Sequence, residues 1–187
     1  MAQAFYYIYI HLEGELIIMK HALSVLVNNQ PGVLLRVVGM FSRRSFNIDS
    51  LSVGITQSPK YSRITIFFQG EAYIVDQMIK QLAKIPDVAA VQLHNPEDAV
   101  YRGMTLIKVK ANDHNRLDVL KLAELFRARV VDVQSTTLIF EITGHDEKVT
   151  AFTRLLAPYG ISEIIRTGQI ALERGEKTIN SYKDKTG

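Results

Sequence analysis

Hydrophobic residues recur along the chain with two periods, one typical of strands and one typical of helices. From His21 the two periods succeed each other in a regular order, and Gly70 separates one apolar strand from the helical stripe that follows. The first half predicts strand, helix, strand, strand, helix, strand, over residues 21–28, 32–44, 48–57, 61–69, 74–82 and 88–93. We therefore expect one sheet covered by two helices in this half.

The same order of elements returns after the polar stretch HNPEDAVYRG. The second half predicts strand, helix, strand, strand, helix, strand over residues 105–111, 116–127, 130–135, 137–143, 147–157 and 161–167. Gly144 ends a strand before a helix as Gly70 does in the first half, which indicates an internal repeat. The fold class expected is α+β, with two tandem ferredoxin-like βαββαβ units. Each sheet leaves one face without helices, and we expect the other half or a second chain to bury it, so a dimer is predicted.

The repeat also predicts the domain organisation. The expected segments are an N-terminal extension (1–19), a first domain (20–95), a polar linker (96–103), a second domain (104–175) and a mobile tail without periodicity (176–187). Two interpretations of the extension are open: an additional hairpin that turns at Glu13-Gly14-Glu15, or a gene start at Met19. Its apolar run is interrupted by charges and lacks a basic start, so we expect neither a signal peptide nor a membrane span.

Composition and charge exclude several classes of function. The 187 residues carry 22 Lys and Arg against 19 Asp and Glu, a scattered excess of +3 that does not favour nucleic-acid binding. Cysteine is absent, and no two of the five histidines are spaced four residues apart as helical metal ligands would be, so no metal site is expected. No Walker loop, GxGxxG or Ser/His/Asp set stands out, so we expect no catalytic residues. A cytoplasmic, non-catalytic protein is the simplest interpretation.

The turn Asn29-Gln30-Pro31-Gly32, between the first strand and the first helix, is the candidate binding site. Proline suits the first turn of a helix, and glycine lets a ligand approach the backbone. The N–H groups of Gly32, Val33 and Leu34 have no acceptor within the helix, and with the helix dipole they suit a carboxylate. The carboxamide of Asn29 could bind the ammonium of a zwitterion.

A purely structural interpretation of the same residues is also open. Asn29 and Gly32 could simply form the turn and cap the helix, and Asn47 could be a C-terminal cap of that helix.

The string LSVLVNNQPGVLLRVVGMFSRRSFNIDSLSVG, residues 23–54, strongly resembles the ACT domain of the small regulatory subunit of acetolactate synthase, also called acetohydroxyacid synthase. The resemblance continues through SRITI (62–66), QMIKQLAKIPDV (77–88), ELFRARVVDV (124–133) and residues 143–175. It covers nearly all of residues 20–177 and is more specific than a general ACT pattern.

The resemblance implies a subunit that activates a large catalytic subunit and confers feedback inhibition by a branched-chain amino acid, usually valine. It implies no cofactor in this chain, with thiamine diphosphate, Mg²⁺ and FAD in the catalytic partner. It also implies a homodimer through the ACT domains, with the effector bound between two chains. By motif position, the implied effector-binding residues are Asn29, Gly32, Val33, Leu34, Asn47 and Ile48.

Two positions depart from the family pattern. Ser45 stands where the family has glycine, so we expect an altered loop conformation before Asn47, and Asn28 stands where an acidic residue is frequent. An alternative function is an amino-acid-responsive regulator of another enzyme or of transcription, although no segment is left over for a basic recognition helix. The second half lacks an NxPG turn, so we interpret residues 110–119 as structural or partner-contacting.

Overall fold

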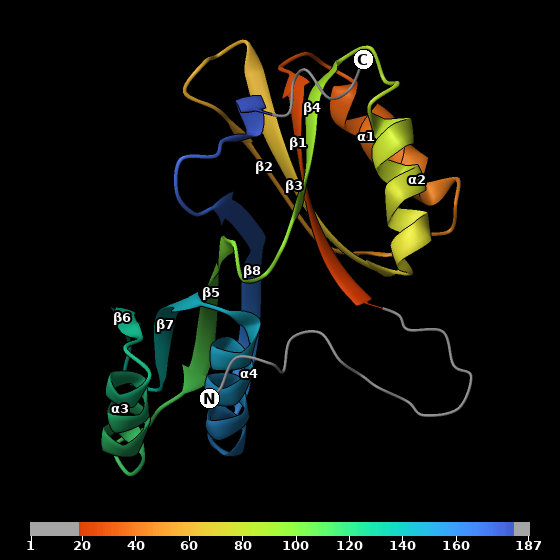
Figure 1. The fold of residues 1–187 in the computed structure, drawn as a ribbon. Helices are drawn as coiled ribbons and strands as arrows, with labels where there is room; N and C mark the ends of the chain where they lie inside the picture. Colours follow the sequence, from red (N-terminus) through yellow and green to blue (C-terminus); the bar gives the residue numbers. More distant parts are fainter. Residues whose placement is uncertain (1–18, 182–187) are drawn as a thin grey trace, which may run out of the picture. The chain divides into compact units, whose positions relative to one another are not determined.

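The computed structural model describes residues 19–181, so the alternatives for the N-terminal extension lie almost wholly outside the described residues. These residues fall into two compact units, one up to Val100 together with the segment from Ala171, and one over Tyr101–Ile170. Each unit is a four-stranded sheet with two helices on one face (Figure 1). The predicted α+β class, with two tandem βαββαβ units, is confirmed.

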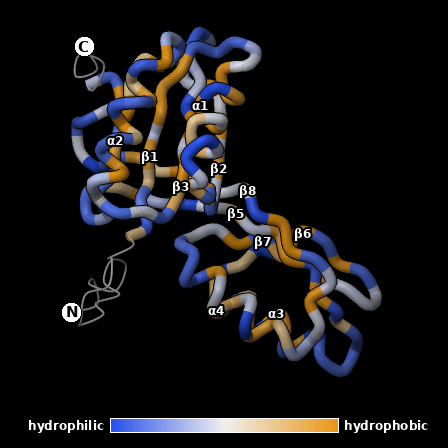
Figure 2. Tube along the Cα trace, turned by 90° about the vertical axis from the view of Figure 1, so that its right-hand side faces the viewer, coloured by the Kyte–Doolittle hydropathy of each residue, from blue (hydrophilic) through white to orange (hydrophobic). Residues whose placement is uncertain are grey.

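The first unit contains β1 (Met19–Asn28), α1 (Val33–Ser42), β2 (Ile48–Ile55), β3 (Tyr61–Gly70), α2 (Ala72–Leu82) and β4 (Val88–His94). The strand order is β2-β3-β1-β4, and neighbouring strands are antiparallel. The hydrophobic core lies between sheet and helices, and hydrophobic residues are frequent along β1 and β3 (Figure 2). Its fully buried members include Leu23, Val25, Phe41, Ile64, Ile66, Phe68, Met78 and Leu82.

The second unit repeats this plan with β5 (Ala99–Lys110), α3 (Arg116–Leu125), β6 (Arg129–Val133), β7 (Thr137–Gly144), α4 (Asp146–Leu156), a 3₁₀ turn (Ala157–Tyr159) and β8 (Ile161–Glu173). The strand order is β6-β7-β5-β8. Its own core includes Ile107, Val109, Val119, Leu138, Phe140, Ile142, Phe152 and Leu156.

Two expected strand boundaries are wrong. Residues 99–103 of the predicted linker belong to β5, because this strand continues into a stretch that its polar and glycine residues made look like a loop. The last strand does not end at Thr167 but runs on to Glu173, through Gly168, whose φ of 80° breaks the alternation. Gly103 lies opposite, where a Cβ would come within 3.1 Å of the Gly168 carbonyl oxygen.

The described part of the predicted mobile tail, residues 176–181, packs onto the first unit through Ile179. Ile179 is 8% exposed and contacts Leu26 and Ala90, which lie on the sheet face opposite the helices. β1 is therefore buried on both faces, which is why Leu26 is as inaccessible as the core residues beside it. An isolated isoleucine in a polar tail gave no periodic signal, but its burial here is favourable by roughly 1–2 kcal/mol.

A buried polar cluster (Ser24, Arg63, His94) fixes the end of β8, directly before this segment, on the same face. The Arg63 guanidinium donates to Ser24 Oγ at 2.8 Å and to the Ala171 carbonyl at 2.9 Å, and Ser24 Oγ lies 2.8 Å from His94 Nε2. The Gln92 carboxamide donates to the Glu173 carboxylate. Because Ser24 accepts from Arg63, its own hydroxyl can donate to His94, which requires an unprotonated Nε2.

This cluster predicts a pH-dependent stability. Burial, and then the nearby Arg63 charge, lower the pKa of His94 to about 4. An unfolded histidine titrates near pH 6.5, so between about pH 4 and 6.5 the unfolded chain binds a proton that the folded chain does not. The free energy of unfolding should therefore fall as the pH drops through this window, and His94→Gln should reduce the loss by on the order of 2 kcal/mol between pH 6.5 and 4.5.

Urea unfolding of both proteins across this pH range measures the difference. Burial also lowers the pKa of His21, but His21 is present in both proteins and its contribution cancels. Parallel pH profiles for the wild type and His94→Gln would contradict the prediction.

Candidate functional site

The end of β1 is held from both sides before the chain enters the turn. The Asn28 N–H donates to the Asp87 carbonyl at 2.8 Å, and the Asn29 N–H donates to the Lys60 carbonyl at 2.8 Å. Lys60 lies in the connection between β2 and β3, and Asp87 lies directly before β4. The turn thus starts from a position fixed by the neighbouring strands on both sides.

The Asn29 side chain is oriented by the connection between β2 and β3. Its Nδ2 donates to the Pro59 carbonyl at 3.1 Å, and its Oδ1 accepts from Ser62 Oγ at 3.1 Å. A carboxamide has two N–H donors and two acceptor lone pairs, so one of each is left for a ligand. The Asn29 side chain therefore stabilises the turn, as the structural interpretation expected. Asn29 is also exposed, so its remaining donor and acceptor are accessible.

Gly32 is the N-cap of α1, and its φ of 82° and ψ of −11° place it in the left-handed region. This conformation favours glycine and turns the start of the helix outward. Of the three predicted amides, that of Val33 is engaged by the Gln30 carbonyl at 3.4 Å, while among the described residues no backbone carbonyl accepts from Gly32 or Leu34. The Val33 side chain is buried in the core, so Val33 can face a ligand only through its backbone.

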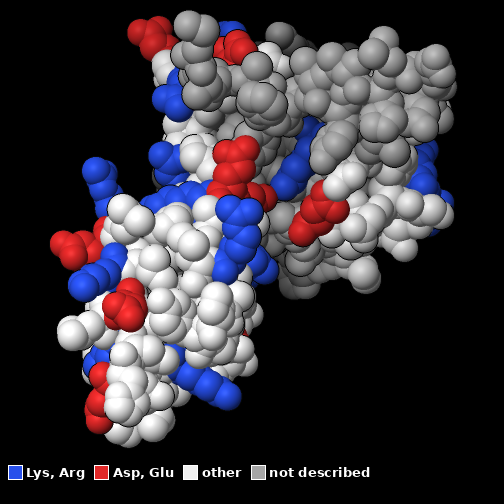
Figure 3. Space-filling model, turned by 90° about the horizontal axis from the view of Figure 1, so that it is seen from below, with Lys and Arg blue, Asp and Glu red and all other residues white. Residues whose placement is uncertain are grey.

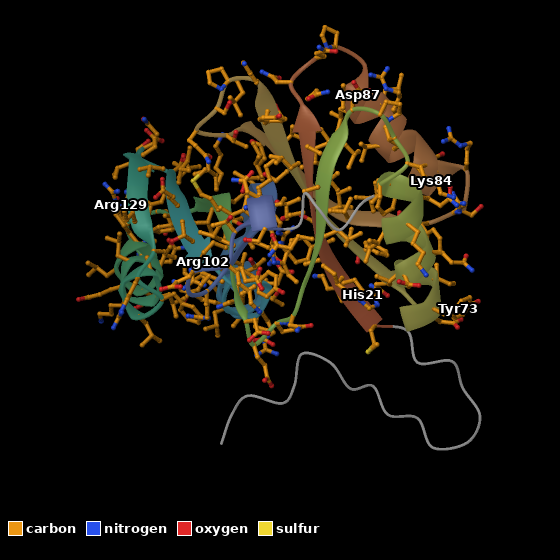
Figure 4. All side chains as sticks on the ribbon, turned by 45° about the horizontal axis from the view of Figure 1, so that its top comes forward. His21, Tyr73, Lys84, Asp87, Arg102 and Arg129 are labelled. Carbon is orange, nitrogen blue, oxygen red and sulfur yellow. The ribbon has the colours of Figure 1, made fainter. Side chains whose placement is uncertain are left out.

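A cationic side chain that sequence reasoning missed lies beside this turn. Arg36 Nη1 would be only 3.5 Å from a Cβ at Gly32. Arg36 Nη2 is 2.6 Å from Oδ2 of Asp87, the residue labelled in Figure 4. The spacing of four residues from Gly32 to Arg36, one helical turn, could have suggested the proximity. The partner Asp87 could not be found without knowing that β4 lies next to β1. The result is a positive side chain close to the proposed carboxylate position.

Asn47 and Ile48 lie at the opposite end of α1. The helix has 10 residues, so its ends are about 15 Å apart. The exposed Asn47 donates from Nδ2 to Asp49 Oδ1 at 3.2 Å, while Ile48 begins β2 and packs against the core. The structure thus brings together four of the predicted residues (Asn29, Gly32, Val33, Leu34) and keeps the other two apart from them in the same chain.

The C-cap of α1 is Arg43 and the left-handed residue after the helix is Ser45, so the interpretation of Asn47 as the cap is wrong. Ser45 has a φ of 56°, its N–H donates to the Ser42 carbonyl, and the Phe46 N–H donates to the Phe41 carbonyl. These two hydrogen bonds define a Schellman motif, in which glycine is the preferred left-handed residue. The loop keeps the conformation that glycine would give it, and Ser45 bears the strain.

On the described residues of the face drawn in Figure 3, basic and acidic side chains are interspersed and form no continuous basic stripe. Within residues 19–181, no group of three or more His, Asp or Glu side chains could hold a metal ion. No helix among these residues is long and apolar enough to cross a membrane.

Two ferredoxin-like units in tandem, with an exposed glycine turn between the first strand and the first helix, define the class of ACT-type proteins. Residues 23–90 match the family described as the AHAS small subunit-like ACT domain, and residues 102–175 match the small subunit of acetolactate synthase. The chain belongs to the family of acetolactate synthase small subunits.

Named relatives agree in sequence and in structure. A probable acetolactate synthase small subunit from Archaeoglobus fulgidus is 46% identical, over 85% of this chain and 99% of that protein. The acetolactate synthase small subunit from Mycobacterium bovis is 44% identical, over 87% and 97%. A crystal structure of the small subunit from Thermotoga maritima has a TM-score of 0.79 and 39% identity, over 84% of this chain and 99% of that one. These relatives are named as a subunit of an enzyme, as the sequence resemblance predicted.

The strain at Ser45 predicts that Ser45→Gly stabilises the protein. A left-handed residue with a side chain costs about 1–2 kcal/mol, partly offset by the greater freedom of glycine in the unfolded chain. We expect the free energy of unfolding to rise by about 0.5–1 kcal/mol, measured by urea unfolding. Ser45→Ala is the matched control and should give no gain; equal stabilisation by both variants would contradict the assignment.

Proposed function

We propose that the chain is the regulatory subunit of a cytoplasmic acetolactate synthase. It binds and activates the thiamine-diphosphate-dependent catalytic subunit, and it confers feedback inhibition by a branched-chain amino acid, with valine the first choice. Thiamine diphosphate, Mg²⁺ and FAD belong in this proposal to the catalytic partner. Membership of the small-subunit family supports the partnership.

The observation that carries the effector proposal is the left-handed Gly32 between Asn29 and the start of α1. It exposes helix-start amides, which favour a carboxylate together with the helix dipole, and the guanidinium of Arg36, paired with Asp87, lies beside them. The carboxamide of Asn29 offers an acceptor to an ammonium group. The exposed Leu34 and Leu35 provide apolar surface next to the turn for an aliphatic side chain. A small zwitterion with a branched apolar side chain fits this combination.

The distance between the two ends of α1 supports a site shared by two chains. One chain alone cannot place Asn47 and Ile48 next to Gly32, because α1 keeps them about 15 Å apart. In the proposed homodimer, paired through the first units, the helix start of one chain faces Asn47 and Ile48 of the other. An effector that bridges two chains changes how they pack, which gives it a route to the catalytic subunit.

Activity measurements on the reconstituted complex test both parts of the proposal. The chain should increase acetolactate formation by the catalytic subunit, and L-valine should reverse the increase, whereas D-valine should not. No effect of the chain on activity would refute the regulatory role. Activation without any response to valine, leucine or isoleucine would leave an activator and refute the effector site.

Gly32→Asp should abolish valine inhibition while activation is preserved. The introduced carboxylate occupies and repels the carboxylate position, so we expect the valine affinity, measured by calorimetry, to fall at least about tenfold. Gly32→Asn is the matched control, because asparagine has the same shape, carries no charge and tolerates the left-handed region. It should lose less affinity than Gly32→Asp; equal losses would indicate that shape, and not charge, blocks the site.

A further inference from the structure

The turn after β5 in the second unit is the counterpart of the candidate site. β1 pairs with β3 up to Asn28 opposite Tyr61, and the next N–H, of Asn29, donates to the Lys60 carbonyl at 2.8 Å. β5 pairs with β7 up to Lys110 opposite Thr137, and the next N–H, of Ala111, donates to the Thr136 carbonyl at 2.8 Å. By this register Ala111 takes the place of Asn29, and Ser135 takes the place of Pro59.

Corresponding carbonyl groups are satisfied differently in the two units. In the first unit, Asn29 Nδ2 donates to the Pro59 carbonyl. Ala111 has no such group, and Arg116 replaces it. Its Nη2 donates to the carbonyls of Ser135 at 2.6 Å, Gln134 at 2.7 Å and Ala111 at 3.0 Å. A cation is thus surrounded by three carbonyl oxygens where the first unit offers a carboxamide.

Arg116 lies at a helix position that is electrostatically unfavourable for a cation. Arg116 is the first residue of α3, where the helix dipole disfavours a positive charge. The three carbonyl dipoles around its Nη2 offset that cost, and the side chain is half-buried. Arg116 therefore functions here as a bound cation and not as a solvated surface charge.

The backbone amides of the same turn are also occupied. Asn112 Oδ1 accepts from the N–H groups of His114 and Asn115, at 3.0 and 3.3 Å, and Asn115 Oδ1 accepts from the Asn112 N–H at 2.8 Å. No side chain caps the start of α1 or of α3, so this feature does not distinguish the two helix starts. The difference lies before the helix: the second turn engages its own amides with carboxamide oxygens, and the Arg116 N–H at the start of α3 donates to the Asn112 carbonyl at 2.9 Å.

We propose that the second unit is a self-liganded copy of the effector unit: Arg116 takes the place of the Asn29 carboxamide and closes the turn on three carbonyl oxygens, while the Asn112 and Asn115 carboxamides engage the amides of the turn itself. The contrast with an open effector site in the first unit rests on the proposed function. Each chain then has one effector position, and the turn of the second unit is permanently held in a bound-like arrangement. Removing the arginine should leave a site for a small guanidinium ion.

The test uses Arg116→Ala in the full chain, followed by hydrogen–deuterium exchange. The Gln134 N–H, bonded to the Thr137 carbonyl, and the Ala111 N–H report on the two segments that Arg116 connects. Both should exchange about tenfold faster or more in the variant, because hydrogen bonds from a charged donor are lost. Methylguanidinium at millimolar concentration should restore much of the protection, and sodium chloride at the same ionic strength should not.

Matched controls make the outcomes decisive. Arg154→Ala removes an exposed arginine of α4 in the same unit and should change neither the exchange at these amides nor the response to methylguanidinium. Unchanged exchange in Arg116→Ala, or an equal methylguanidinium effect in the wild type, would overturn the proposal. If the alanine variant does not fold, Arg116→Lys keeps the charge without the planar fork, and partial loss of protection at the same amides is expected.

Titration of the wild type separates this inference from the proposed function. One bound valine per chain supports both, and two per chain would overturn the self-liganded second unit. No binding at all would refute the effector proposal, while the exchange experiment would still decide the role of Arg116.

Discussion

The fixed end of β1 is the constraint on which the candidate site depends. β1 lies between β3 and β4, and its last residues donate to carbonyls on both sides, at Lys60 and Asp87. A turn that starts from such a position cannot shift as a unit, so the left-handed Gly32 directs the start of α1 in one defined direction. The side chains of Asn29 and Arg36 are held by the same two flanking segments. The geometry of the site is therefore a property of the sheet and not of the loop alone.

The buried polar cluster (Ser24, Arg63, His94) on the other face of β1 combines a cost of burial with a specific compensation. Desolvation lowers the pKa of Arg63, and the Glu173 charge raises it, so the guanidinium is both costly to bury and specifically compensated. An apolar contact would hold the C-terminal segment at many registers, whereas Arg63 matches one carbonyl, that of Ala171. Buried polar groups of this kind contribute more to a unique arrangement than to net stability. Ile179 then adds the apolar contact that the cluster lacks.

Sequence periodicity predicted most of the elements, because the apolar run of β1 and the apolar stripe of α2 directly reflect their burial. It could not predict the strand beyond Gly168 or the packing of Ile179, since neither belongs to a repeating pattern. The turn at Gly32 was predictable from local chemistry and from resemblance. Its partners Asp87 and Ser62 were not, because they are distant in sequence and depend on strand order.

The two units show how one backbone plan can be open in one copy and closed in the other. Both place a carbonyl of the strand connection beside the start of the first helix, and both end that helix with a left-handed residue, Ser45 or Arg127. The difference lies in a few side chains at the turn. A ligand shifts an equilibrium only by its differential affinity for two states. Under the proposed function, an effector would act through the first unit alone, because the turn of the second unit is already held by Arg116.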